Sequence, residues 1–349
     1  MRAQWMRPCR QPLADTLRRT ARHGSGLSRH PGFPARTTNS KHKESGMKWF
    51  GRIVAVALLG VMCMSQVARA EQWQKQYPEI TLGVITSENE KDRLIRYELV
   101  QKYLEETLGV KIKWRTATDY AGVIEGVKAG KIQVARFGPA SYAKCYIVTN
   151  GKVEPLVGAL DKDGNLGYHS VIIVKTDSPY KTVQDLKGTK FAFADPNSTS
   201  GHQAPRYFLD EEGIKVDEFF SSATFSGSHE NSVMGLVSGT YDAVATWWRS
   251  DSSNNPKRME SKGMIEPGQW RIIWKSPLLP SSPWAVPTDL PEDMRKDIQK
   301  ALLELPTKDP EAWASFIKGE KISGFAEVTH EDYEPIVRMI QANLKNRKS

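Results

Sequence analysis

Short apolar segments alternate with segments of helical periodicity, and no other sequence feature limits the possible folds as strongly. Residues 80–85, 110–114 and 132–137 have the apolar patterns of strands. Residues 92–108 and 121–128, which lie between them, carry apolar side chains at helical spacing. A β-α-β-α-β order of this kind predicts an α/β lobe with a mainly parallel sheet.

The second half of the chain repeats this alternation. Its strand and helix patterns follow one another at 190–194 (strand), 202–209 (helix), 223–225 (strand), 232–238 (helix) and 241–246 (strand). They predict a second α/β unit over residues 176–270, and the residues after Pro291 are predicted to be mostly helical. Two such lobes with hydroxyl-rich turns between strands and helices are typical of a hinged binding protein.

Residues 47–70 have the features of a secretory signal peptide. A short basic start precedes an apolar stretch at 53–64 that is too short to span a bilayer as an ordinary helix. The small-x-small motif Ala68-Arg69-Ala70 then predicts cleavage before Glu71 and export to the periplasm.

The Arg-rich residues 1–46 are interpreted as an over-extended reading frame upstream of Met47. The alternative is an unusually long basic start to the signal peptide. A lipoprotein signal at Cys63 would need a small residue where Met62 stands.

The formal charge of +9 does not indicate a nucleic-acid-binding surface. Residues 1–70 hold 13 of the 49 Lys and Arg residues but only 2 of the 40 Asp and Glu residues. The remainder, 71–349, therefore carries a slight acidic excess. A protein that binds a polyanion would need a basic surface there, so we expect no nucleic-acid partner.

The segment Asp195-Pro196-Asn197-Ser198-Thr199-Ser200-Gly201 follows a predicted strand and precedes a predicted helix. The first N–H groups of a helix lack partners and carry partial positive charge, and the three hydroxyls add neutral donors. This pattern predicts an oxyanion site that needs no Lys or Arg. The alternative is an Asx/ST turn in which Ser198 caps the helix and no ligand binds.

Enzymatic and metal-binding motifs are absent from the sequence. It has no Gly-x-Ser-x-Gly elbow, no Gly-Lys-Ser/Thr phosphate loop and no His/Cys spacing typical of a metal site. We therefore expect no enzymatic activity, metal or cofactor; an enzymatic alternative would use Ser198 and His229 as nucleophile and base. Cys145 is the single cysteine after the leader, so no intrachain disulfide is expected, and it is interpreted as a small core residue.

Five segments resemble a known protein family. They are TDYAGVI (118–124), FGP (137–139), DPNSTSG (195–201), GSHE (227–230) and IWKSPLLP (273–280). Together they resemble the periplasmic phosphonate/phosphite-binding components of ABC transporters, over nearly the whole mature chain. The resemblance implies a type II periplasmic-binding-protein fold, with residues 71–175 and 271–349 in one lobe, residues 176–270 in the other, a two-crossing hinge and a ligand cleft between them.

The resemblance also implies which side chains hold the ligand. Phosphonate oxygens would be bound by Tyr120, by the hydroxyls and N–H groups of Ser198, Thr199 and Ser200, and by His229. Taken alone, Tyr120 could be a half-buried aromatic residue at a helix start, and His229 could cap the following helix. Phe137 stands where some relatives have a hydroxyl, so only packing is expected from it.

The residues expected to set specificity depart from the family pattern. Ser250 and Ser282 stand where relatives that take aminoalkyl phosphonates have carboxylates, and the alignment of the nearby Asp251 is uncertain. An ammonium group would be poorly paired here, which favours a ligand without an amine, such as an alkylphosphonate or phosphite. The possible walls of the pocket are Phe137, Trp247, Trp248 and Trp284. The alternative role of the three tryptophans is core or hinge packing, and they would also permit a cation–π contact with an amine.

The resemblance implies an ABC permease in the inner membrane as the partner of a monomeric binding protein. An alternative function is sensing, in which the bound oxyanion is presented to a membrane sensor kinase. Some relatives are thought to sense arsenite, for which Cys145 is the one thiol that the mature chain offers.

Overall fold

The computed structural model describes residues 73–85, 88–115, 117–318 and 320–346. The predicted upstream segment 1–46, the predicted signal peptide 47–70 and the expected mature start at Glu71 lie outside the described residues. Both lobes discussed below belong to one compact unit, Trp73–Ser349.

The first lobe is built on a six-stranded sheet in the order β13-β4-β12-β3-β1-β2. Its strands are β1 (Glu79–Val84), β2 (Lys111–Arg115), β3 (Val134–Arg136), β4 (Val153–Asp161), β12 (Pro283–Pro287) and β13 (Ile322–Glu327). β1 pairs in parallel with β2 and β3, whereas β12 runs antiparallel to β3 and β4. The helices of this lobe are α2 (Glu90–Leu108), α3 (Tyr120–Lys128), α4 (Pro139–Val148), α9 (Glu292–Lys308) and α10 (Pro310–Phe316).

Helix boundaries in the first lobe follow ordinary capping chemistry. The Asn89 side chain accepts a hydrogen bond from the N–H of Asp92 at the start of α2, which ends at Gly109 in the left-handed conformation (φ 69°). Asp119 likewise accepts from the N–H of Gly122 and starts α3 at Tyr120. The Asp119 cap matters for function, because it fixes Tyr120 as the first residue of α3.

The second lobe is built on a sheet whose main path is β10-β5-β8-β6-β7. Its strands, with two short ones at the edges, are β5 (Gly167–Lys175), β6 (Lys190–Phe193), β7 (Ser222–Phe225), β8 (Ala243–Ser250), β9 (Ser253–Asn254), β10 (Trp270–Lys275) and β11 (Leu279–Pro280). Its helical elements are η1 (Gln184–Leu186), η2 (Thr199–Gln203), α5 (Ala204–Glu211), α6 (Val216–Phe219), α7 (His229–Val237) and α8 (Asn255–Ser261).

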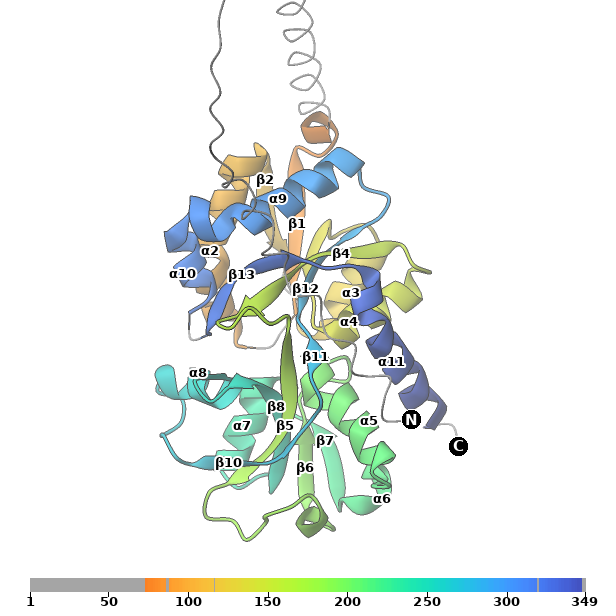
Figure 1. Ribbon diagram of the computed structural model, residues 1–349, viewed down its shortest axis with the longest axis vertical. Helices are drawn as coiled ribbons and strands as arrows, with labels where there is room; N and C mark the ends of the chain where they lie inside the picture. The colour runs from red at the N-terminus through yellow and green to blue at the C-terminus, as the bar shows by residue number, and fades with distance from the viewer. Residues whose placement is uncertain (1–72, 86–87, 116, 319, 347–349) are drawn as a thin grey trace, which may run out of the picture. The chain divides into compact units, whose positions relative to one another are not determined.

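Two chain crossings join the lobes, from β4 to β5 and from β10 through β11 to β12 (Figure 1). A third connection is made by packing: α11 (Glu334–Asn346), which follows the short η3 (His330–Tyr333), lies against both α4 and α5. Its Asn343 amide donates to the carbonyl oxygen of Gln203 at 2.9 Å. β5 and β10 both belong to the sheet of the second lobe. The predicted lobe boundaries at residues 175 and 271 would instead have placed β5 and most of β10 in the first lobe.

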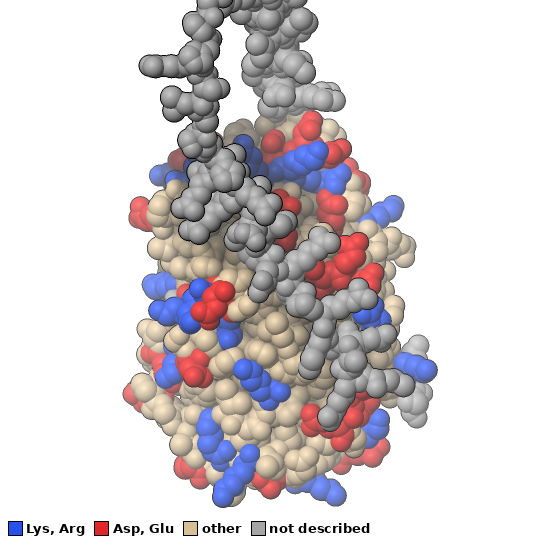
Figure 2. Space-filling view, viewed as in Figure 1, with Lys and Arg blue, Asp and Glu red and all other residues tan. Residues whose placement is uncertain are grey.

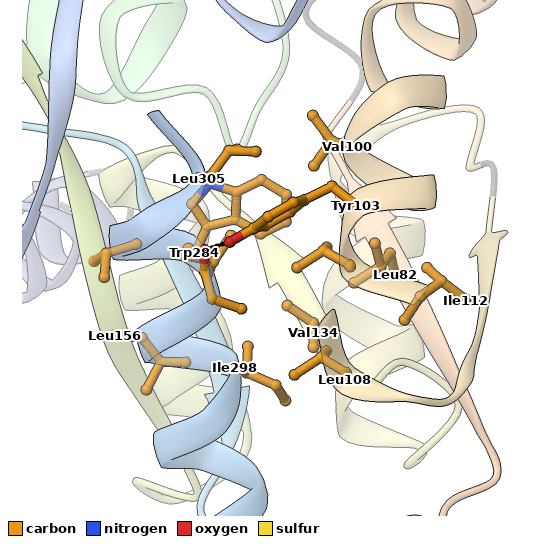
Figure 3. Close-up of a cluster of buried hydrophobic side chains, with 14 of the residues drawn as sticks. Leu82, Val100, Tyr103, Leu108, Ile112, Val134, Leu156, Trp284, Ile298 and Leu305 are labelled. Atoms are coloured by element: carbon orange, nitrogen blue, oxygen red, sulfur yellow. Dashed lines mark hydrogen bonds between the residues drawn. The ribbon is translucent and has the colours of Figure 1, made fainter. Parts of the chain in front are cut away.

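The hydrophobic core of the first lobe gathers around Trp284 on β12 (Figure 3). Trp284 is fully buried, and its ring lies 6.2 Å from the ring of Tyr97 and 6.4 Å from that of Phe316. Burial of such an aromatic side chain removes a large apolar area from water. Trp284 is therefore a core residue of the first lobe, which agrees with the alternative of core packing and not with a place in the pocket wall.

Besides the short β9 and β11, two strands have no counterpart among the patterns predicted from the sequence. β12 is flanked by prolines, but Pro283 is its first residue, where the missing N–H costs no sheet hydrogen bond. β13 lies in the tail that was predicted to be mostly helical, and it pairs antiparallel with β4. Tertiary pairing outweighs local propensity in both cases.

Charged residues of both signs are interspersed on the described part of the face in Figure 2. Within the described ranges, none of the helices combines the length and the apolar character that crossing a bilayer requires.

Candidate functional site

A small cavity of about 60 Å³ lies between the two lobes. The first lobe lines it with Ile85, Tyr120, Arg136, Gly138, Ser282 and Glu320. The segment from Tyr168 to Arg258 lines it with Tyr168, Ser198, Thr199, Ser200, His229, Trp247, Arg249 and Arg258. One buried water needs about 10–15 Å³, so the cavity is large enough for a compact ligand but small for an extended one.

Four helix starts supply polar groups to this cavity. Tyr120 is the first residue of α3, Gly138 precedes α4, Thr199 begins η2 and His229 begins α7. The sequence folds this way because the carboxyl ends of β2, β3, β6 and β7 lead into these helices. The partial positive charges of the helix starts therefore converge on one small volume.

The hydroxyl turn, Ser198 to Ser200, is held by hydrogen bonds from both lobes. The Ser198 hydroxyl oxygen accepts from the N–H of Gly201 at 3.0 Å, as expected of a helix cap, and also lies 3.2 Å from Nε2 of His229. The Thr199 hydroxyl oxygen accepts from the N–H of Ala140 in α4 at 2.8 Å. Ser198 therefore caps the helix, as the alternative interpretation expected. The turn nevertheless also lines the cavity, so its hydroxyls remain available to a ligand.

Gly201 lets these groups approach one another. A Cβ atom added there would lie 2.6 Å from Cβ of Ala194, 2.8 Å from Oγ of Ser198 and 2.9 Å from Cε1 of His229. Contacts this short between non-bonded atoms are not tolerated in a packed interior. The glycine at the end of the DPNSTSG segment is therefore a requirement of close packing.

Asp195 and Tyr120 connect the turn to α3. Oδ2 of Asp195 accepts from the N–H of Tyr120 at 3.4 Å, across the two lobes. Burial raises the pKa of the Tyr120 phenol, and the Asp195 carboxylate adds to that effect. The phenol consequently keeps its proton and acts as a hydrogen-bond donor.

His229 is a neutral member of the site. Its Nδ1 lies 3.1 Å from the hydroxyl oxygen of Thr246. Burial, together with the nearby Arg258 charge, lowers the pKa of His229 to about 3. The imidazole is therefore uncharged at neutral pH and contributes only neutral hydrogen bonds.

Replacing His229 by glutamine should flatten the pH dependence of stability. Above pH 6.5 the imidazole is neutral in both the folded and unfolded states. Below that pH only the unfolded state takes up the proton, so the wild type loses stability as the pH falls toward about 3. Between pH 7 and pH 5, the wild type should lose up to about 2 kcal/mol more free energy of unfolding than the variant. Urea unfolding measures this difference, and parallel pH profiles would contradict the assignment.

Three arginines that the sequence analysis did not select also line the cavity: Arg136, Arg249 and Arg258. One carboxylate, Glu320, lines it with them, so the formal charge of the lining has an excess of two positive charges. The sequence predicted an oxyanion site without Lys or Arg, and that expectation is incomplete. Arg136 and Arg249 stand at the carboxyl ends of β3 and β8, which is the one signal in the sequence that could have indicated them.

Buried ion pairs join the lobes beside the cavity. Glu320 lies 2.8 Å from Arg96 of the first lobe and 3.1 Å from Arg249 of the second. Glu88 of the first lobe lies 3.3 Å from Lys262, which is itself 2.9 Å from Glu230. Burial alone would raise the pKa of Glu320, but the guanidinium groups of Arg96 and Arg249 outweigh it and hold that pKa well below its usual range. Glu320 is therefore ionised and saturated with arginine partners.

The four aromatic side chains expected at the pocket wall separate into two groups. Trp247 lines the cavity, and the guanidinium of Arg258 lies 5.3 Å from its ring. Trp248 instead lies beside His169 and Lys275, Phe137 is buried in the core next to α3, and Trp284 is in the first-lobe core. Neighbouring residues of a strand face opposite sides of the sheet, so Trp247 and Trp248 cannot both face the cavity.

Cys145, the thiol considered for the sensing alternative, does not line the cavity. Cys145 on α4 is fully buried in an apolar cluster, away from the cavity lining, and burial raises the pKa of its thiol to about 12. Among the described residues, no cluster of His, Cys, Asp or Glu side chains is arranged to hold a metal ion. Tyr168 is a lining residue that the sequence analysis missed; burial raises the pKa of its phenol, while hydrogen bonding with the Thr199 and Ser200 side chains opposes that rise.

Comparison with known proteins relates this chain to one family of periplasmic binding proteins. A sequence profile of the family described as "ABC transporter, phosphonate, periplasmic substrate-binding protein" matches residues 82–333. The phosphate-import protein PhnD of Mycolicibacterium smegmatis is 33% identical over 298 residues, which cover 80% of this chain and 91% of that protein. The phosphonates-binding periplasmic protein of Escherichia coli is 29% identical over 236 residues, covering 66% of this chain and 67% of that protein.

A solved structure supports the same fold. PhnD1 of Prochlorococcus marinus, in complex with methylphosphonate, has a TM-score of 0.66 at 22% identity, covering 77% of this chain and 99% of that chain. Two α/β lobes around a small polar cavity define a periplasmic binding protein of the type II fold, as the sequence predicted. The profile match shows further that this chain belongs to the family of phosphonate-binding periplasmic proteins, the substrate-binding components of ABC transporters.

Proposed function

We propose that this protein captures a small phosphorus oxyanion, a phosphonate or a phosphite-like ion, in the cavity between its lobes and delivers it to an ABC permease. The observation that supports this most directly is the convergence of Tyr120, the hydroxyl turn (Ser198 to Ser200) and His229 on one cavity. These groups are the predicted ligand-binding residues, and all of them can donate a hydrogen bond to an anionic oxygen.

The energetics of such a site suit a reversible carrier. A hydrogen bond to a charged acceptor contributes about 1.5–3 kcal/mol. Four or five of them reach micromolar affinity, about 8 kcal/mol, once the cost of ordering ligand and side chains is subtracted. The helix starts and the cationic excess of the lining strengthen this attraction without covalent or metal chemistry.

The size of the cavity narrows the ligand class. A cavity of this size suits a compact anion such as phosphite, phosphate or methylphosphonate. The names of the relatives support the same range, because one is a phosphate-import protein, one binds phosphonates and one was solved with methylphosphonate.

In this proposal one lobe consists of residues 71–175 and 271–349, and the other of residues 176–270. Ligand release requires the two lobes to separate about the two chain crossings that join them. In the proposed cycle, the protein is exported by the signal peptide 47–70, starts near Glu71 and works as a monomer without nucleic acid. No chemical step is proposed: Ser198 already accepts from the N–H of Gly201, and the proposed role of its hydroxyl is to hold the ligand. The thiol chemistry of the sensing alternative has no support, because Cys145 is buried and is not among the residues that line the cavity.

A titration series tests the proposed function. Purified protein, freed of bound ligand by unfolding and refolding, would be titrated calorimetrically with methylphosphonate, phosphite, phosphate, arsenite and sulfate. At least one phosphorus oxyanion should bind with micromolar or tighter affinity and raise the melting temperature, because a ligand that binds only the native state stabilises it by mass action. Binding of sulfate or arsenite alone, or turnover of a phosphonate ester, would contradict the proposal.

A further inference from the structure

Arg136 is a cation in the cavity lining that forms no ion pair of its own with the described residues, although Glu320 lies in the same lining. Its Nε atom is buried and lacks a hydrogen-bond partner, and no ion pair joins it to any residue in the part of the chain that the structure describes. Its guanidinium carbon lies 5.4 Å from the ring of Phe316, a contact that supports the side chain without satisfying its donors. Arginine carries five N–H donors in a rigid fork, so this side chain retains unused capacity for an oxygen ligand.

The charges around Arg136 do not balance without a bound anion. Four other cations belong to the interlobe cluster: Arg96, Arg249, Arg258 and Lys262. The four carboxylates that face them are Glu88, Asp92, Glu230 and Glu320. These eight groups form ion pairs with one another, and Arg136 is the additional positive charge. Arg136 is half-buried, and a ligand oxygen beside its buried, unpartnered Nε would offset the cost of removing that donor from water.

The same part of the cavity is unsuited to an amine. Ser282 lines it where a carboxylate would be needed, and Ser250 is absent from the described lining. Glu320 is the one carboxylate of that lining, but Arg96 and Arg249 already occupy it. An ammonium group placed here would meet guanidinium groups and no free carboxylate, which is unfavourable at short range.

We propose that Arg136, together with Arg249, forms a second anion-accepting subsite that selects phosphorus oxyanions whose fourth substituent presents an acidic oxygen. Such a ligand has a tetrahedral phosphorus atom with three oxygens that bind the hydroxyl turn and a fourth substituent whose acidic oxygen binds the arginines. Two kinds of compound have this chemistry: inorganic phosphate, and a short carboxylated phosphonate such as phosphonoformate. This inference depends on the proposed function and refines its ligand class.

The geometry divides the cavity into two differently charged parts. Thr199 of the hydroxyl turn contacts α4 through the N–H of Ala140. Arg249 instead pairs with Glu320 at 3.1 Å. The guanidinium of Arg136 lies over the ring of Phe316, at the end of α10 shortly before Glu320 in the chain, so both arginines lie on the Glu320 side. An anion held by the turn would therefore direct its remaining substituent toward guanidinium groups. The small volume favours phosphate, because phosphonoformate carries two more non-hydrogen atoms, and it disfavours longer acids still more.

The test compares ligands that differ in the fourth substituent. Calorimetry on the wild-type protein at pH 8 would use phosphate, phosphonoformate, methylphosphonate and 2-aminoethylphosphonate. Phosphate or phosphonoformate should bind at least about tenfold tighter than methylphosphonate, which replaces the fourth oxygen by a methyl group, and 2-aminoethylphosphonate should bind most weakly. The stronger of the two acidic ligands identifies the source.

Variants then assign the preference to Arg136. Arg136→Met should reduce the preference for the acidic ligand over methylphosphonate to less than about threefold, and Arg136→Lys should restore part of it, because charge returns without the fork. The matched control is Arg338→Met, which removes an exposed arginine on α11 and should leave all affinities unchanged. Circular dichroism would verify folding, and the wild-type series decides the question even if Arg136→Met does not fold.

The outcomes separate this inference from the proposed function. If methylphosphonate or 2-aminoethylphosphonate binds as tightly as both acidic ligands, or if Arg136→Met weakens every ligand by the same factor, the second subsite is refuted while the proposed function stands. If no phosphorus oxyanion binds the folded wild-type protein, both are refuted.

Discussion

Replacing Ser198 and Thr199 together by alanine is expected to weaken binding of the phosphorus oxyanion by a factor of about 100 or more. Each hydroxyl that donates to a charged oxygen contributes about 1.5–3 kcal/mol, so losing both costs several kcal/mol of binding free energy. The double change also removes the side-chain acceptors of the Gly201 and Ala140 N–H groups. The backbone hydrogen bonds of the turn and the close packing at Gly201 remain, so the variant is expected to stay folded. Calorimetric titration with the best ligand of the wild type measures the change.

A second hydroxyl pair provides the matched control. Ser238 and Thr240 are surface residues whose hydroxyl oxygens lie 3.1 Å apart, outside the cavity lining. The double change Ser238→Ala with Thr240→Ala should leave ligand affinity within about twofold of wild type, because surface substitutions away from the site have small effects. Equal affinity of the Ser198/Thr199 variant and the wild type, with both proteins folded, would remove the hydroxyl turn from the binding site.

Replacing Glu320 by alanine should lower the free energy of unfolding by about 3–5 kcal/mol, the usual cost of removing one partner from a buried ion pair. The change leaves the guanidinium groups of Arg96 and Arg249 without their closest carboxylate. Ligand should recover part of the stability, since an anion in the cavity supplies a counter-charge for the arginines. Urea denaturation with and without ligand measures both effects.

An exposed glutamate serves as the control for this prediction. Glu334 pairs with Arg338 on the surface of α11, and both side chains are more than half exposed. Glu334→Ala should cost no more than about 1 kcal/mol, because solvent screens surface ion pairs. Similar losses for Glu320→Ala and Glu334→Ala would mean that the ion pairs between the lobes do not stabilise the fold beyond an ordinary surface pair.

Local sequence patterns predicted the parts of this protein that local chemistry determines. The strand and helix alternation predicted two α/β lobes, and the Asp119 cap and the hydroxyl turn marked two of the helix starts at the cavity. β12 and β13 were missed because their stability comes from pairing with β4, a strand more than a hundred residues away. A proline-flanked or isolated apolar segment gives no local sign of such a partner.

The charged part of the site could not be predicted for a related reason. Arg136, Arg258 and Glu320 come from three distant segments, and each would pass for an ordinary charged residue if its neighbours were unknown. The sequence therefore predicted a site made of neutral donors, whereas the cavity also contains guanidinium groups. The orientation of Trp247 and Trp248, in contrast, could have been predicted from the alternation of side chains along β8.

The most direct test of the central claim is a crystal structure of the protein grown with its tightest-binding phosphorus oxyanion. The account predicts density for one tetrahedral anion between the lobes, within hydrogen-bonding distance of Tyr120 and of the hydroxyls of Ser198 and Thr199, with a remaining substituent facing Arg136. An anion bound outside this cavity, or a cavity occupied by water alone at saturating ligand, would contradict it.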